Sequence, residues 1–64
     1  MVPMALVDVT PPKLVQVLVD GTWYPGELRA WQKLDGRWRG YVLYVVGVGL
    51  RKLGWFPEHA IRPV

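Results

Sequence analysis

Aromatic and basic residues alternate along the segment from Asp20 to Tyr41, DGTWYPGELRAWQKLDGRWRGY. Flat aromatic rings stack on nucleic-acid bases, and Lys and Arg side chains neutralise phosphates. Their combination on one surface therefore predicts nucleic-acid binding, with DNA as the partner. The residues predicted to form this surface are Arg29, Trp31, Lys33, Arg37, Arg39, Tyr41 and Arg51.

A second set of aromatic residues favours a different chemistry. Aromatic grooves bind proline-rich or cationic peptides by stacking and cation–π attraction. A nearby carboxylate helps to hold a cation, and Asp20 is the candidate. The alternative prediction is a protein- or peptide-interaction module whose groove is lined by Trp23, Tyr24, Tyr44 and Trp55.

Residues that support catalysis are scarce in this chain. Nucleophilic catalysis needs a nucleophile beside a base, and the sequence contains no Ser, no Cys and a single His. That residue, His59, follows Glu58 in a turn-like segment and is interpreted as a surface residue. A metal site needs three or four converging ligands, which the scattered acidic residues do not provide. We therefore predict no catalytic residue, no metal site and no cofactor.

Length and composition restrict the class of protein. Sixty-four residues form one small domain, and 52% of them are hydrophobic. A core of this size cannot hide that much apolar surface, so part of it is expected to face a partner. The formal charge of +3 is compatible with nucleic acid. No signal peptide and no membrane-spanning run is recognisable, which predicts a cytoplasmic protein.

Turn signals divide the chain into short strands. Residues 1–12 are predicted to form an extended arm, because prolines at its end forbid a helix. Residues 13–64 are predicted to form a small all-β, five-stranded barrel. Its predicted strands are 14–19, 23–33, 37–46, 50–56 and 61–64, and its turns are 20–22, 34–36 and 47–49, with a 3₁₀ turn at 57–60.

The register of the middle hairpin follows if its loop has three residues, 34–36. One face is then apolar and belongs to the core, with Trp38 near its rim. That face pairs Ala30 with Gly40, Leu28 with Val42 and Gly26 with Tyr44. The other face is basic and aromatic and pairs Lys33 with Arg37, Trp31 with Arg39 and Arg29 with Tyr41.

The next hairpin leaves two registers open. A three-residue loop at 47–49 places Tyr41 opposite Trp55 and Leu43 opposite Leu53, whereas a two-residue loop sends Leu53 and Trp55 into the core. In the first register the strand from Tyr41 to Val46 is apolar on both faces, so something must cover it. Either the N-terminal arm or a second subunit can do so, and we predict a homo-oligomer.

The segments VQVLVDGTWYPGELRAW, GYVLY and GWFPEHAIRPV resemble SH3-like barrels of the Tudor and Agenet type over residues 14–63. The resemblance implies binding of methylated Lys or Arg in an aromatic cage, with Trp23 and Tyr44 at two cage positions. The Asp-Tyr-Gly-Asn stretch that completes many such cages is VVGVG here, so the implied cage is incomplete.

The same segments are also similar to the type II plasmid-borne dihydrofolate reductases, SH3-like barrels that form a tetramer around one central pore. Their pore uses a Val-Gln-Ile-Tyr stretch and a lysine. At the corresponding positions this chain has Leu53, Gly54, Trp55 and Phe56, and Val17. Because the glutamine and lysine are missing, the resemblance implies the fold, and a reductase is the third alternative for function.

Overall fold

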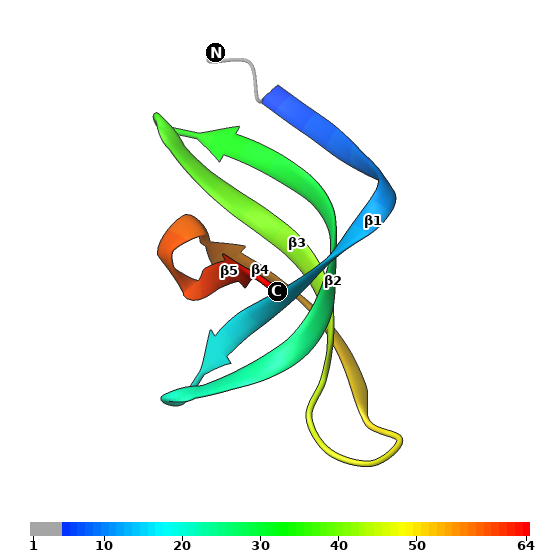
Figure 1. Ribbon diagram of the computed structural model, residues 1–64. Coiled ribbons are helices and arrows are strands. Elements are labelled where there is room, and N and C mark those ends of the chain that lie inside the picture. The colour runs from blue at the N-terminus through cyan, green and yellow to red at the C-terminus, as the bar shows by residue number, and fades with distance from the viewer. Residues whose placement is uncertain (1–4) are drawn as a thin grey trace.

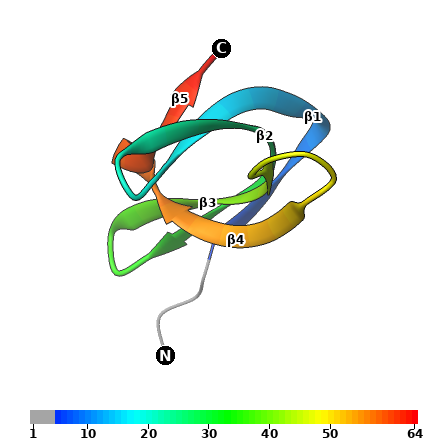
Figure 2. The same cartoon turned by 90° about the horizontal axis from the view of Figure 1, so that it is seen from below.

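The chain forms one antiparallel sheet that curls into a half-barrel (Figures 1 and 2). The computed structural model describes residues 5–64. The sheet contains five strands in the order β4-β3-β2-β1-β5. This architecture confirms the predicted all-β class and is compatible with an SH3-like barrel.

The elements occur in the predicted order. Valine-rich segments form strands because β-branched side chains pack well on a pleated surface. The bounds are β1 Ala5–Val19, β2 Thr22–Leu34, β3 Arg37–Val45, β4 Arg51–Pro57, the 3₁₀ helix η1 Glu58–Ala60 and β5 Ile61–Pro63. Within residues 5–64, no helix is long and apolar enough to cross a membrane.

Strand β1 is longer than the sequence predicts. Residues 5–8, which belong to the predicted arm, pair with residues 30–33 of β2. A register shift separates this ladder from the one that starts at Lys13. Two consecutive prolines lie in between, and proline has no N–H to donate to a ladder. The first four residues of the predicted arm lie outside the described residues.

The loop of the β2–β3 hairpin contains two residues rather than the predicted three. Asp35 and Gly36 have φ angles of 51° and 77°. Both central residues of a type I′ turn adopt this left-handed conformation, and its twist matches that of the flanking strands. Leu34, which was predicted to lie in the loop, is the last residue of β2 and pairs with Arg37.

The shorter loop changes which side chains share a face. The predicted pairs near the loop, including Trp31 with Arg39 and Arg29 with Tyr41, are wrong. The observed pairs are Lys33 with Trp38, Gln32 with Arg39, Trp31 with Gly40 and Ala30 with Tyr41. A bulge between Leu28 and Ala30 absorbs the one-residue difference. Beyond the bulge, the predicted pairs of Leu28 with Val42 and of Gly26 with Tyr44 are confirmed.

The β3–β4 hairpin has the longer of its two possible loops. The Val46 N–H donates to the Leu50 carbonyl oxygen at 3.1 Å, which closes a three-residue loop. Tyr41 therefore lies opposite Trp55. Leu43 likewise lies opposite Leu53, so the strand is apolar on both faces as this register predicts.

The core occupies one face of the curled sheet, which we call the inner face; the opposite face is the outer face. The core consists of Val15, Val17, Leu28 and Val42. Partly buried Tyr24, Tyr44, Trp31, Phe56 and Ile61 pack against these four residues. Among the described residues, strand β5 pairs with residues 15–17 of β1 and with no other segment. The half-barrel is therefore closed beside these residues and open beside residues 5–8.

Candidate nucleic-acid interface

Three adjoining hollows cross the open end of the inner face, and we call them the tryptophan groove. The central hollow, of about 250 Å³, is lined by Val7, Trp31, Trp38 and Glu58. A second hollow shares Trp31 and Glu58 with it and reaches Lys13. The third shares Trp38 and Glu58 with it and reaches Arg37 and His59. Two indole rings and one carboxylate therefore line the middle of the groove.

The strand register turns both tryptophans into the groove. Trp31 pairs with Gly40, and Trp38 lies two residues before Gly40 on the same strand. Side chains two residues apart project from the same face of a strand. Gly40 also provides the necessary room, because a Cβ atom there would lie 3.3 Å from the Trp31 ring and 2.5 Å from Ile61 Cδ1.

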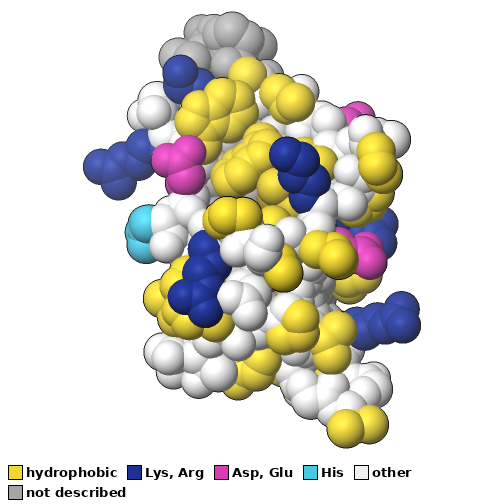
Figure 3. All heavy atoms as spheres, in the orientation of Figure 1, with side chains coloured by type: hydrophobic (Ala, Val, Ile, Leu, Met, Phe, Trp, Pro, Cys, Tyr) yellow, Lys and Arg dark blue, Asp and Glu magenta, His cyan; other side chains and the backbone are white. Residues whose placement is uncertain are grey.

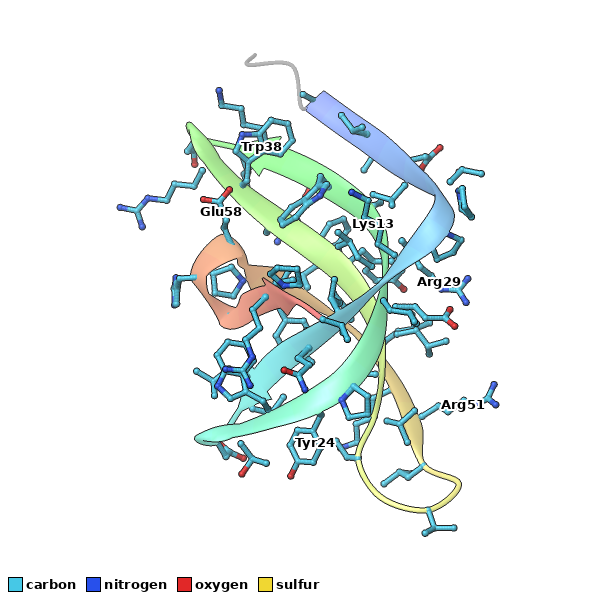
Figure 4. The ribbon with its side chains drawn as sticks, in the orientation of Figure 1. Lys13, Tyr24, Arg29, Trp38, Arg51 and Glu58 are labelled. Atoms are coloured by element: carbon cyan, nitrogen blue, oxygen red, sulfur yellow. The ribbon has the colours of Figure 1, made fainter. Side chains whose placement is uncertain are left out.

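Glu58 reaches the groove from a different part of the chain. It opens η1, directly after Pro57, whose extended backbone (φ −64°, ψ 154°) directs the chain out of β4. Ala60 is buried and anchors the short helix, and the Ile61 N–H donates to the Glu58 carbonyl oxygen. Figure 4 shows Glu58 beside Trp38, with Lys13 on the other side of the open end.

Basic side chains surround the groove. Lys13 and Arg62 line the hollow on the β5 side, and Arg37 lines the hollow on the hairpin side. The Lys33 Nζ lies 5.8 Å from the centroid of the Trp38 ring. Figure 3 shows apolar side chains on this face with basic groups spread around them. Four cations therefore accompany the single carboxylate of Glu58, so the surroundings favour an anionic ligand.

The outer face carries a separate aromatic cluster, the outer platform, made of Tyr41, Trp55 and Arg39. The rings of Tyr41 and Trp55 are 4.8 Å apart and tilted by 42°. The Arg39 guanidinium lies 4.5 Å from the centroid of the Trp55 ring. The Arg39 Nε donates to the Oε1 of buried Gln32 at 2.6 Å, which holds the guanidinium in place.

The structure divides the predicted nucleic-acid-binding set between two faces. Trp31 and Lys33 belong to the inner face, with Arg37 at the same end, whereas Arg39 and Tyr41 form part of the outer platform. The prediction that Trp31 shares a face with Tyr41 is wrong, because the two-residue loop reverses the faces of residues 30–33.

The two remaining members of that set lie apart from both clusters. Arg29 forms an exposed ion pair with Glu27, with a distance of 3.3 Å between Nη2 and Oε2. Arg51, at the start of β4, lines a different hollow together with Leu14 and Leu43. Neither side chain contributes to the tryptophan groove.

The predicted aromatic groove is also divided. Tyr24 and Tyr44 pack against the core from the inner face, and the Tyr44 ring meets Phe56 edge-on at 5.1 Å. Trp55 lies in the outer platform. Trp23 lies under the Arg62 guanidinium, 4.0 Å from its ring centroid. These four aromatic residues therefore do not line one groove.

Sequence reasoning missed Val7, Lys13 and Glu58 as groove residues and assigned Trp38 only to the rim of the core. The signal for Trp38 was present, since it shares a face with Gly40. Glu58 carried no such signal, because a carboxylate in a turn is usually solvated. Within the described part of the chain, no three His, Cys, Asp or Glu side chains converge as a metal site would require.

In comparisons with known proteins, no protein-family model, curated protein or solved structure matches this chain. The groove itself is therefore the basis for a functional assignment.

Proposed function

We propose that this chain is a non-enzymatic module that binds single-stranded DNA in the tryptophan groove. The observation that carries the proposal is the central hollow, where the rings of Trp31 and Trp38 flank a space of about 250 Å³. Unpaired bases stack on such rings, at roughly 1–3 kcal/mol for each base. In a duplex the bases are already stacked and do not enter a hollow of this kind.

The charge around the hollow favours this ligand over a cationic peptide. Lys13, Lys33, Arg37 and Arg62 surround it, and Glu58 is the acidic residue that lines it. Phosphates on either side of a stacked base would meet these cations. A methylated lysine or an arginine would instead be repelled by them. The Tudor-type resemblance of the sequence supports a binding module, and the groove supports an anionic ligand for it.

Affinity is expected to be modest and sensitive to salt. Three or four phosphate contacts to single-stranded DNA give a slope of about −2 to −3 in a plot of log binding constant against log salt concentration. The measurement is fluorescence anisotropy of a labelled single-stranded oligonucleotide of mixed sequence between 50 and about 200 mM NaCl. Absence of binding at the lowest salt, or binding that ignores salt, would refute the proposal.

Two tryptophan variants locate the site. Trp38→Ala removes a groove ring and should weaken binding by about tenfold or more. Trp55→Ala removes a ring of the same type from the outer platform and should leave the affinity within about twofold. Circular dichroism and thermal unfolding check that both variants fold. Equal losses in the two variants would contradict the assignment to the groove.

A specific feature of the outer face favours self-association as a second function of the module. Leu53 is 54% exposed, and Leu43 lies opposite it. Residues 5–8 of the arm pair with β2 and leave this surface uncovered. A symmetric dimer that joins two such faces would bury these side chains.

The oligomer is tested by sedimentation equilibrium. Leu53→Glu should convert a dimer of the 7.3 kDa chain into a monomer and leave the circular dichroism spectrum unchanged. Val48→Glu, at an exposed loop position, is the matched control and should have no effect on assembly. A wild-type chain that is monomeric at high micromolar concentration rules out self-association.

A further inference from the structure

Among residues 5–64, the carboxylate of Glu58 has neither an ion-pair partner nor a hydrogen-bond partner. The ion pair seen within residues 5–64 joins Arg29 to Glu27, and no hydrogen bond of the Glu58 side chain is seen there. Lys13 and Arg37 line hollows that Glu58 also lines, yet neither lies within ion-pair distance of it. Both carboxylate oxygens are therefore available to a ligand.

The backbone that carries this carboxylate is held by the fold. Buried Ala60 and the Ile61 N–H bond hold the backbone of η1, which packs against β1 and β3. Glu58 borders all three hollows of the groove. A base stacked on Trp31 or Trp38 would thus present its edge within reach of the Glu58 carboxylate.

A carboxylate accepts hydrogen bonds and donates none, so it discriminates among base edges. On its Watson–Crick edge, guanine offers two adjacent donors, N1–H and the N2 amino group, which match two carboxylate oxygens. Adenine and cytosine each offer one amino donor beside an acceptor nitrogen. Thymine offers one imino donor between two carbonyl oxygens, which repel a carboxylate. In single strands this edge is free for recognition.

We infer that Glu58 makes the tryptophan groove selective for guanine. The two tryptophans stack on the base, and the Glu58 carboxylate determines which base is preferred. This inference rests on the proposed binding of single-stranded DNA. It also accounts for an acidic residue at the centre of a groove that cations surround, where a carboxylate otherwise opposes phosphate binding.

The test uses the full chain and four labelled thymidine oligonucleotides that differ at one central base: guanine, hypoxanthine, adenine or cytosine. Anisotropy titrations at low salt should give guanine the tightest binding, by about tenfold over adenine. Hypoxanthine lacks the N2 amino group but keeps N1–H, so its affinity should fall between those of guanine and adenine.

Two charge-matched variants separate recognition from simple electrostatics. Glu58→Gln should reduce the guanine-to-adenine ratio to within about twofold while all four oligonucleotides still bind. Glu27→Gln removes the same charge from the exposed ion pair outside the groove and should leave the ratio unchanged. A ratio that survives in Glu58→Gln overturns the inference, as does a wild-type chain without preference for guanine.

The failure of this inference differs from a failure of the proposed function. If no oligonucleotide binds the wild-type chain, both are overturned. If all four bind equally well and Trp38→Ala abolishes binding, the groove is a DNA site and only the role of Glu58 is wrong.

Discussion

Each end of β1 places a valine on the inner face of the sheet, but the two valines differ in how far they are buried. Val17 lies opposite Tyr24 and is completely buried, whereas Val7 lies opposite Trp31 and is 50% exposed. The difference comes from β5, which pairs with residues 15–17 and reaches no further along β1. A strand of three residues thus determines which end becomes core and which end becomes a groove.

The largest difference in unfolding free energy is expected when an aspartate replaces the valine at one end of β1 or the other. Val17→Asp buries a carboxylate without a partner, which costs more than about 4 kcal/mol. A domain of this size has a total stability of roughly 3–10 kcal/mol, so most of this variant should be unfolded. Val7→Asp faces the open groove and should change the unfolding free energy by less than about 1 kcal/mol.

Urea denaturation followed by circular dichroism measures both variants. Similar unfolding free energies for the two would show that the end beside residues 5–8 is closed in solution, and would remove the basis for the groove.

A smaller difference in stability is expected between alanine substitutions at two glycines, Gly26 on β2 and Gly54 on β4, the strands on either side of β3. A Cβ atom at Gly26 would lie 2.8 Å from Val42 Cγ1 and 2.9 Å from the Leu43 carbonyl oxygen. The backbone of β3 must move to accept it, so Gly26→Ala should destabilise the closed end by about 1–3 kcal/mol.

Gly54→Ala is the control for this substitution, because a Cβ atom there meets nothing closer than 3.5 Å, at the Phe56 ring. Its thermal unfolding midpoint should stay near that of the wild type. If Gly26→Ala is as stable as Gly54→Ala, the packing of β2 on β3 at the closed end is looser than described.

The smallest change in stability is expected for a substitution in β5, the strand that closes the half-barrel. Arg62 stacks on Trp23 and its Nε donates to Gln16 Oε1 at 2.7 Å. Both interactions are exposed, so Arg62→Ala should cost about 0.5–1 kcal/mol. Arg37→Ala, an exposed arginine at the open end, is the matched control and should change the unfolding midpoint less. A larger effect for Arg37 would reverse the comparison.

The sequence predicted the positions of the strands and turns better than it predicted which face of the sheet each side chain occupies. Glycines beside aspartates predicted turns at 20–22 and 34–36, each one residue longer than the observed turns at 20–21 and 35–36. Valine-rich runs predicted the strands between them. The chemistry of the site depended on a finer feature. Because the loop is one residue shorter than predicted, Trp31 and Lys33 lie on the inner face. The bulge between Leu28 and Ala30 compensates for the shift in register, so the pairs beyond it are the predicted ones. Both loop lengths suit an Asp-Gly turn, so the local sequence could not choose between them.

By itself, the sequence determined an all-β chain with tight turns and with more apolar and aromatic side chains than one small core can hide. These properties follow from backbone preferences and composition, which act locally. The tertiary structure alone decided that Trp31 and Trp38 share a hollow and that Glu58, from the far end of the chain, enters it. Such convergence depends on sheet curvature and on where β5 pairs with β1, and both are set by packing among strands that are distant in sequence.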